Sequence, residues 1–483
     1  MTMKKIFILI SVITFSINGL QSQIIPLESN VKTVQLSEKD NSVLKKHLNR
    51  YSTFEIDKKQ LLENLSLYGK CHFRLNINSE YKWDIDLQVN NMTTPDYKAF
   101  YSTDDGSFLY EEPYVPNTYK GETSSGDIVR LTIDDDEFWG LVLKEQEQVT
   151  IRHTRHYTGN KEDNSLVIFN NKDVILSDDD LKPINDIIDV PIEENPELRS
   201  IPYNSNIKTF AWQVSCPYHL TIATDADYEF YQQRGSNLAD TYNFIFSVLN
   251  MAEGAYQSTF NLKFMIPYMN VWTTSSDPYT QMDDSLLLLE FRDIWNLTHM
   301  GVYRNIAHLF TGKAVTGGTG RAYVGQIENP NTTVNNASFA YGVSFHNPYI
   351  YKTTTHEIGH NLNGQHVTDL INCQCSGPDR SVMCPYSGHS SLWFCQQSIN
   401  EINPFLYSNR ALLQSNFVNT LTLTSGISGF NFYQAISSIT SSQIINSGFT
   451  AYRSASIILQ PGFEVKLGAA FSAEIKDITD CGN

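Results

Sequence analysis

The sequence lacks any apolar run of the roughly 20 residues that a membrane-spanning helix requires. The run from Ile6 to Ile17 is too short, and no later stretch approaches the required length. Lys4 and Lys5 precede this run and small or polar residues up to Ser22 follow it, which is the layout of a secretory signal peptide. We therefore expect residues 1–22 to be a signal peptide and the protein to be secreted, with no membrane span.

Positive charge is scarce as well. The chain has 35 Lys and Arg against 52 Asp and Glu, a formal net charge of −17. This excess of negative charge repels phosphate backbones and so argues against nucleic-acid binding. The 41% hydrophobic and 12% aromatic content argues against a disordered chain, and 483 residues are enough for several domains.

Cysteine is rare, with seven in the chain. Five of them lie between Cys216 and Cys395, whereas Cys71 and Cys481 lie far from that region. In an exported protein this pattern predicts disulfide bonds, although it leaves their pairing open. Cys71 lies in a strand-like alternation of polar and apolar residues, so we expect a buried free thiol there and not a thiolate that keeps a metal site latent.

Composition divides the chain into blocks. Residues 23–200 alternate polar and apolar residues, which predicts a β-rich first domain. The end of this block, from Asn171 to Arg199, is acidic, contains prolines and has little periodicity. We interpret it as an exposed linker, the kind of segment that proteases cut, with a maturation cut near Arg199.

Residues 201–415 predict a layered α/β domain, because strand and helix patterns alternate along them. The expected helices and strands, in chain order, are Tyr218 to Ala223 (strand), Leu238 to Tyr256 (helix), Leu262 to Trp272 (strand), Ser285 to Leu297 (helix), Asn305 to Phe310, Arg321 to Gly325 and Phe339 to Phe345 (strands).

A linker over 416–429 is expected to lead to a small all-β module over 430–483. Turn-plus-Phe units such as Pro461-Gly462-Phe463 punctuate the module, and Ser438-Ile439 recurs as Ser456-Ile457. Short strands with repeated turns favour a solenoid-like arrangement.

One segment carries chemistry, and it runs from His356 to His366 with the sequence HEIGHNLNGQH. His356 and His360 are four residues apart, so on a helix they share a face and can bind one metal ion. Glu357 lies next to the first of them and can reach a water bound to that ion.

The third histidine needs a change of chain direction. His366 is too far along a continuous helix to reach the same ion, so the helix must stop and the chain must turn back. Asn363-Gly364 offers that turn, because Asn and Gly best tolerate the left-handed conformation. Three neutral imidazoles with an open fourth position are the pattern of catalytic zinc.

This segment resembles the metzincin zinc metallopeptidases, and among them the reprolysin (adamalysin-like) family of secreted bacterial type with a propeptide. Residues Gly320 to Gly325 are similar to the family's substrate edge strand, and Ser381 to Pro385 resembles its Met-turn. The likeness covers residues 215–408. Asn363 and Val367 differ from the Gly and Asp that the family usually has at these positions.

The resemblance implies a fold and a reaction. The fold is an α/β (α+β) catalytic domain with a twisted mixed sheet and an active-site helix, preceded by a β-rich propeptide that keeps the enzyme a zymogen. The reaction is endopeptidase cleavage of a protein or peptide by a zinc-bound water, with Glu357 as general base and His356, His360 and His366 as zinc ligands. Met383 lies under the metal site, and a calcium ion is a further expectation without assigned ligands.

The substrate edge is implied in the same way. Main-chain groups of the edge strand would pair with an extended substrate, and the residues concerned are Ala322, Tyr323, Val324 and Gly325. Tyr386 is expected at a wall of the pocket, and three other histidines are expected to be hydrogen-bonded residues and not ligands; they are His308, His346 and His389. The sequence does not predict an oligomeric state.

Two alternatives remain open. The first is a non-catalytic extracellular binding protein that keeps the fold, although such proteins typically lose the general base, which Glu357 supplies here. The second is a gluzincin-type peptidase whose third ligand is a downstream Glu such as Glu401, which the well-placed His366 makes unnecessary.

Overall fold

The computed structural model describes residues 27–188, 218–413 and 420–475, apart from short interruptions at 29, 113–114, 135, 185, 315, 317, 330–337, 387, 428–430 and 436. The expected signal peptide, the expected cut near Arg199, and both Cys216 and Cys481 lie outside these residues. Within them, no helix is long and apolar enough to cross a bilayer.

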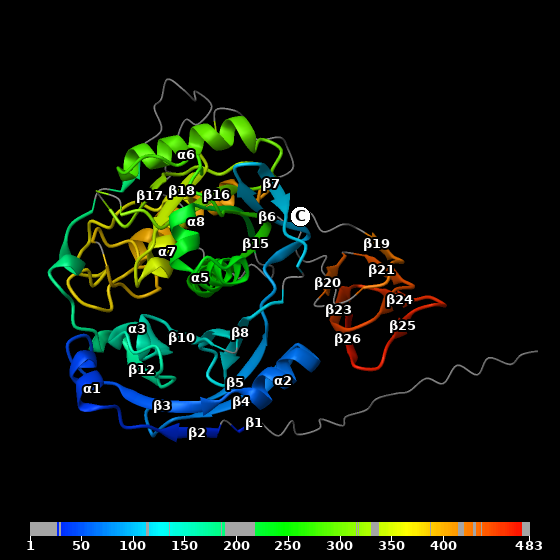
Figure 1. Ribbon diagram of the computed structural model, residues 1–483, viewed down its shortest axis with the longest axis horizontal. Coiled ribbons are helices and arrows are strands. Elements are labelled where there is room, and N and C mark those ends of the chain that lie inside the picture. The colour runs from blue at the N-terminus through cyan, green and yellow to red at the C-terminus, as the bar shows by residue number, and fades with distance from the viewer. Residues whose placement is uncertain are drawn as a thin grey trace, which may run out of the picture.

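The first block builds a ten-stranded sheet, here the N-terminal sheet, in the order β1-β4-β5-β8-β9-β10-β11-β12-β3-β2 (Figure 1). All its pairings are antiparallel except that of β1 with β4. Alternate residues such as Phe73, Leu75 and Ile85 are buried on one face, as the sequence pattern predicts. The strands are β1 Leu27–Glu28, β2 Asn30–Thr33, β3 Ser52–Asp57, β4 Lys70–Asn76, β5 Lys82–Val89, β8 Thr118–Thr123, β9 Ile128–Ile133, β10 Phe138–Lys144, β11 Glu147–His153 and β12 Leu166–Asn170.

Short helices accompany this sheet. They are α1 Glu38–Leu44, α2 Lys59–Tyr68 and α3 Arg155–Thr158, together with the 3₁₀ turns η1 Asn171–Asp173 and η2 Asp179–Leu181. Gly69 ends α2 in the left-handed conformation, at φ 66°. Cys71, on β4, has a half-buried free thiol.

The second block builds an eight-stranded mixed sheet, here the central sheet, in the order β13-β17-β18-β16-β14-β15-β6-β7. β17 runs antiparallel to β18, whereas the inner strands from β18 to β6 are parallel. Its strands are β6 Thr93–Thr103, β7 Gly106–Leu109, β13 Ile187–Ile188, β14 Tyr218–Ala226, β15 Leu262–Trp272, β16 Ile306–Thr311, β17 Gly320–Tyr323 and β18 Tyr341–Phe345. The mixed α+β character that the sequence predicts is confirmed.

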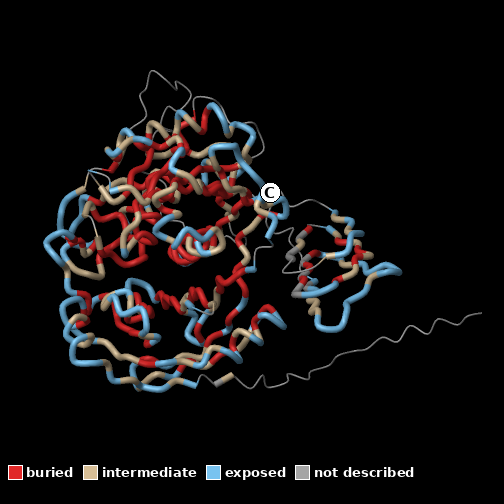
Figure 2. Tube along the Cα trace, viewed as in Figure 1, coloured by how far each residue is buried: buried red, intermediate tan, exposed pale blue. Residues whose placement is uncertain are grey.

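Helices cover both faces of the central sheet. One core joins α6 to one face through residues such as Leu287, Phe291 and Trp295. A larger core joins α5 and α7 to the other face and also contains Trp139 and Leu141 of the N-terminal sheet. Helix α5 therefore lies between the two sheets, as the band of buried chain in Figure 2 shows. The helices are α4 Tyr228–Gln233, α5 Leu238–Phe260, α6 Asp284–Thr298, α7 Ile350–Asn361 and α8 Gln396–Ser408.

The elements predicted for residues 201–415 are all present. Strand β15 has the predicted bounds, and helix α6 differs by one residue at each end. Helix α5 continues four residues past the predicted end, until Asn261 adopts the left-handed conformation at φ 50°. Asn is one of the few non-glycine residues that this conformation suits.

The first block also supplies strands at both edges of the central sheet. Strand β6 pairs in parallel with β15 at one edge, with register partners from Ile266↔Thr93 to Trp272↔Ser102. At the other edge, β13 pairs in parallel with β17. The two blocks therefore share one sheet, which the division of the sequence at residue 200 does not predict.

The C-terminal module has three small sheets, of β19-β21-β24, β20-β23-β26 and β22-β25, and every pairing is parallel. The repeated Ser-Ile pairs lie in register, since Ile439 pairs with Ile457. Strand β19 lies in the expected linker, so the module begins earlier than predicted. The strands are β19 Thr420–Leu423, β20 Asn431–Gln434, β21 Ser438–Ser441, β22 Ile444–Ile445, β23 Gly448–Ser454, β24 Ile457–Leu459, β25 Glu464–Val465 and β26 Ala469–Ile475.

A buried ion pair joins β9 to α5. Arg130 Nη2 lies 3.4 Å from Glu253 Oε2, and both side chains are at most 1% exposed. Asn90 donates to the same carboxylate at 2.6 Å, and Arg130 also donates to Gln257 Oε1 at 2.5 Å. A Cβ atom on Gly254 would lie 2.9 Å from Arg130 Cγ, so the glycine makes room for the arginine.

Breaking this pair should be far more costly than breaking an exposed one. Arg130→Met leaves Glu253 charged and buried, and we expect it to lower the free energy of unfolding by about 3–5 kcal/mol. Lys172→Met breaks the exposed pair with Glu147 and should cost less than about 1 kcal/mol. Urea unfolding followed by tryptophan fluorescence measures both, and equal midpoints for the two variants would contradict the role given to Arg130.

Candidate metal centre

Helix α7 places His356 and His360 on one buried face. The helix ends at Asn361, and Asn363 follows in the left-handed conformation at φ 73°. The N–H of Gly364 then donates to the carbonyl of Gly359 at 2.8 Å, which closes the turn. The turn that the sequence places at Asn363-Gly364 is therefore present, and it directs the chain back toward the two histidines.

The three histidines converge at their Nε2 atoms. His356 Nε2 lies 3.0 Å from His360 Nε2 and 3.2 Å from His366 Nε2. Four ligands at about 2.0–2.1 Å from a tetrahedral zinc ion lie about 3.3–3.4 Å apart, so these spacings are close to those of a metal site. The structure thus brings together the three residues that the motif predicts as ligands.

The opposite ring nitrogens show why a cation fits between the rings. His356 Nδ1 lies 2.6 Å from the Val382 carbonyl, and His360 Nδ1 lies 2.7 Å from the Gly364 carbonyl. A carbonyl only accepts, so each Nδ1 carries the proton and each Nε2 presents a lone pair. Lone pairs that face one another repel unless a positive ion lies between them, and this is the ligand arrangement that second-shell carbonyls impose at metal sites.

A fourth group, Asp186, completes the cluster, and the sequence analysis missed it. Its carboxylate oxygens lie 3.5 Å from His356 Nε2, 3.4 Å from His360 Nε2 and 2.8 Å from His366 Nε2. No hydrogen bond of favourable geometry reaches either oxygen from the described residues, as expected for a carboxylate that faces a metal position. Burial raises the pKa of Asp186, but the three imidazoles outweigh it and hold this pKa well below its usual range.

Asp186 belongs to residues 177–188, which we name the covering segment. Ile184 N donates to the Pro385 carbonyl at 3.2 Å, and beyond Asp186 the segment becomes β13 beside β17. The interpretation of residues 171–199 as an exposed linker is therefore wrong for 171–188, whose residues Asn171, Asp173, Asp180 and Asp186 are buried. The sequence signal that could have predicted a buried segment here is the set of isoleucines around Asp186, namely Ile184, Ile187 and Ile188.

The predicted substrate edge is the edge that β13 covers. Ala322 and Tyr323 lie in β17 opposite Ile187 and Ile188. Val324 and Gly325 follow the strand, and Gly325 N donates to the His360 carbonyl at 2.9 Å, which ties this edge to the helix of the metal ligands. That a substrate pairs with these four residues stays a prediction.

Glu357 is 1% exposed and its Oε2 has no hydrogen-bond partner among the described residues. Burial raises the pKa of Glu357 well above its usual range, and the charges of Asp186 and Asp284 add to this, while Arg321 opposes it. The carboxylate packs on Gly320, where any side chain would collide with it. Its role as general base stays a prediction that this location permits.

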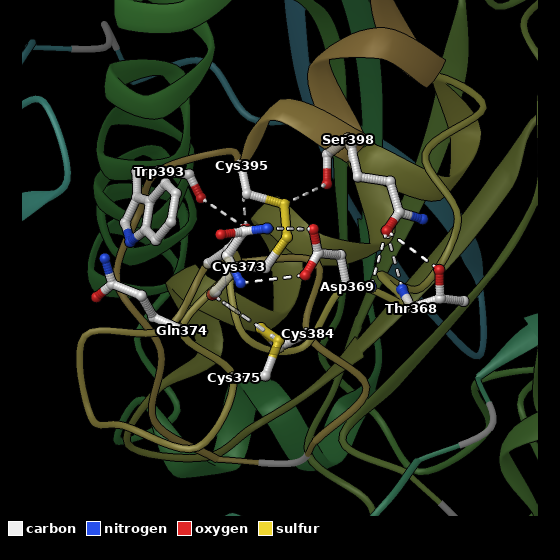
Figure 3. The surroundings of a disulfide bond; sticks show 12 residues. Thr368, Asp369, Cys373, Gln374, Cys375, Cys384, Trp393, Cys395 and Ser398 are labelled. Carbon is white, nitrogen blue, oxygen red and sulfur yellow. Dashed lines mark hydrogen bonds between the residues drawn. A yellow bond between two sulfur atoms is a disulfide. The ribbon is translucent and has the colours of Figure 1, made fainter.

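Met383 lies beneath the histidines with no exposed surface. Its sulfur contacts the position that a Cβ on Gly359 would take, so the helix lies directly on the methionine. Two disulfides, Cys373–Cys395 and Cys375–Cys384, brace the segment that carries it (Figure 3). They settle part of the pairing that the sequence left open.

Other candidates lie apart from the cluster. Glu401 accepts hydrogen bonds from Gln365 N and Gln397, so it is not a third ligand. His308 bonds to Ser344, and His346 bonds to Arg234, as the sequence analysis expects for non-ligands. Among the described residues, one group of three or more His, Cys, Asp or Glu has the spacing to hold a metal, and Cys71 does not belong to it. The same residues contain no second group of this kind that could bind calcium.

Two comparisons relate the chain to known proteins. Residues 217–400 match the family model Reprolysin_5, metallo-peptidase family M12. These residues are therefore similar to the metallopeptidases of family M12. Among solved structures, the chain is similar to metalloproteinase-II from Bacteroides fragilis, with 12% identity and a TM-score of 0.44 over 72% of this chain and 94% of that one. The metallopeptidase family and the His/Asp group together imply a metal cofactor.

Metal content should depend on the third histidine. We expect His366→Ala to weaken metal binding by more than the roughly 10- to 100-fold that loss of an outer partner causes. His72→Ala, which alters a histidine paired with Asp86 on the N-terminal sheet, should leave the content unchanged. Metal analysis of the purified, dialysed chains measures both, and full occupancy in His366→Ala would exclude this ligand.

Proposed function

We propose that the chain is the latent precursor of a secreted zinc endopeptidase. The observation that carries the proposal is the convergence of three imidazole Nε2 atoms beside the buried carboxylate of Glu357, whose Oε2 has no hydrogen-bond partner among the described residues. This combination supplies both a metal position and a proton acceptor next to it. The metallopeptidase family match supports the same class of reaction.

The chain's own residues have distinct parts in the proposed mechanism. His356, His360 and His366 would hold zinc, which when bound lowers the pKa of a coordinated water and polarises a substrate carbonyl. Glu357 accepts the proton of the attacking water at its free Oε2 and later returns it to the leaving amine. The main chain of β17 aligns an extended substrate beside the site.

Asp186 accounts for latency in this proposal. Catalytic zinc sites keep a fourth position open for water, whereas closed sites have four protein ligands. The carboxylate of Asp186 lies against all three imidazoles and so would be the fourth protein ligand of a zinc ion held there. The covering segment also takes up the edge of β17 that a substrate would need. The chain is therefore expected to be inactive until this segment leaves.

Secretion is part of the proposal and rests on two observations. The predicted signal peptide at residues 1–22 directs export. The two disulfides near the metal centre need an oxidising compartment to persist.

The base is tested by a conservative change. Glu357→Gln keeps the shape of the side chain but removes its ability to accept a proton, and we expect a loss of at least about 100-fold in kcat on casein or gelatin by the processed protein. A zinc chelator should abolish the wild-type activity, and added zinc should restore it. If the wild type binds metal but cleaves neither substrate, the non-catalytic binding protein becomes the better proposal.

Latency is tested in the uncut chain. Asp186→Ala removes a charged ligand, which is worth about 1.5–3 kcal/mol or more, so we expect unprocessed Asp186→Ala to cleave casein at least about tenfold faster than the unprocessed wild type. Asp179→Ala is the matched control, because Asp179 lies in the same segment with an exposed side chain paired to Lys182. Asp186→Ala and Asp179→Ala chains of equal activity would remove Asp186 from the latency mechanism.

A further inference from the structure

Strand β6 belongs to the first block, yet it is an inner strand of the central sheet (Figure 1). It has eleven residues, pairs in parallel with β15 on one side, and pairs with β7 on the other. Main-chain bonds mark both ends of the β15 pairing: Ile266 N donates to the Met92 carbonyl at 2.7 Å, and Thr273 N donates to the Ser102 carbonyl at 2.9 Å. The first block is therefore attached to the second block along most of β15.

Side chains add to this pairing. Ser102 Oγ donates to Asn270 Oδ1 at 2.9 Å, and both residues are 1% exposed. Tyr242 OH, on α5, donates to the Phe100 carbonyl at 2.6 Å, and the ring of Phe100 stacks on that of Tyr268 with centroids 5.2 Å apart. These contacts combine buried hydrogen bonds with aromatic packing, so detaching β6 would lose both.

A second contact joins the first block to α5. Asn90 Nδ2 donates to Asn250 Oδ1 at 2.9 Å, in addition to its bond with Glu253. Asn250 Nδ2 donates in turn to the Leu131 carbonyl at 3.0 Å. Together with the Arg130–Glu253 pair, these bonds form one buried network across the two blocks. Such a network couples the elements that it joins, because each buried group that loses its partner is costly.

A third contact reaches the loop that follows Met383. Leu392 N donates to Gln148 Oε1 at 2.8 Å, and Asn171 Nδ2 donates to Ser391 Oγ at 3.0 Å. Gln148 and Asn171 are at most 1% exposed. The contacts with β15, with α5 and with this loop use residues outside the covering segment. They can therefore hold the first block in place whether or not the covering segment is bound.

The covering segment, in contrast, is short and continues directly from the first block. Residues 174–185 are all that separates Asp186 from η1. A segment tethered this closely keeps a high effective concentration at its site, even when the chain is cut beyond it. The predicted cut near Arg199 lies beyond Asp186, so it leaves Asp186 attached to the first block.

We propose that the first block stays bound to the second block as a separate chain after a cut near Arg199, and that the cut protein stays latent until a second cut detaches Asp186 from the first block. The inference rests on the proposed peptidase function. The second cut falls on the exposed residues Ser177, Asp178 and Asp179. An endopeptidase makes each cut by adding one water across one peptide bond. The detached piece then loses its tether and leaves, while β6 stays in the sheet.

Retention of the first block is tested by one specific cut. A protease recognition sequence is inserted after Arg199 of the full chain, the purified protein is cut to completion, and gel filtration follows without denaturant. We expect both chains in one peak at the position of the uncut protein. Casein cleavage should stay within about twofold of the uncut rate, because Asp186 is still tethered at the metal centre. A separate peak of the first block would overturn its retention, and a casein rate about tenfold higher would overturn the persistent latency.

The second cut is tested by adding another recognition sequence after Asp178. Cutting at both sites should raise the casein rate at least about tenfold, with the first block still in the peak of the second block. A doubly cut protein that stays as inactive as the singly cut one, while unprocessed Asp186→Ala is active, would overturn the second step. If metal-loaded Asp186→Ala also cleaves nothing, the peptidase function fails, and gel filtration still decides whether the first block is retained.

The source of the attachment is tested with variants of the singly cut chain. Arg130→Met leaves Glu253 without its cation and should raise the dissociation constant of the two chains at least about 100-fold, whereas Lys172→Met, which breaks an exposed pair, should leave it unchanged. Asp186→Ala should also leave the two chains together, since β6 and α5 hold them. A dilution series in the analytical ultracentrifuge measures all three variants.

Two results would contradict attachment through β6 and α5. One is release of the first block by Asp186→Ala, and the other is an equal dissociation constant for Arg130→Met and Lys172→Met. Circular dichroism before the cut shows whether Arg130→Met is folded, and if it is not, the result for Asp186→Ala alone decides.

Discussion

Three imidazole nitrogens that point at one another are the constraint on which the rest of this structure depends. The arrangement would be repulsive without a cation, and it persists because carbonyls of Val382 and Gly364 fix the opposite face of two of the rings. Those carbonyls are in turn set by local features: the left-handed Asn363 returns the chain to the helix, and two disulfides hold the segment around Met383. The metal centre is therefore specified by backbone geometry as much as by the identity of its ligands.

The same three imidazoles explain why the covering segment of the first block can bury Asp186. Asp186 lies 2.8–3.5 Å from the Nε2 atoms of the three histidines, which hold the pKa of this carboxylate well below its usual range. A buried carboxylate without such a partner would be costly. The three histidines belong to residues 218–413 and Asp186 belongs to the first block, so this contact joins the two blocks.

The sequence predicted the metallopeptidase domain well because its signals are local. The helix–turn over residues 356–366 and the strands and helices from Tyr218 to Phe345 follow from periodicity and from residues that tolerate special conformations. Asp186 could not be found this way. Its role depends on contacts with histidines 170 to 180 positions away, and the acidic, proline-containing composition around it resembles that of a linker. The pairings of β6 and β13 with the central sheet were not predicted for the same reason, since pairing with another block leaves no periodic trace.

The two edges of the central sheet differ in how they hold the first block. Strand β6 has eleven residues and pairs along β15, whereas β13 has only two. The main-chain bonds of the covering segment are few and long: Ile184 to Pro385 at 3.2 Å, Ala322 to Asp186 at 3.2 Å and Val324 to Ile188 at 3.4 Å. Each such bond contributes only about 0.5–1.5 kcal/mol. The contact of Asp186 with the three imidazoles therefore contributes much of the hold on the metal centre, whereas the β6 pairing and the buried Arg130–Glu253 pair keep the first block folded against α5.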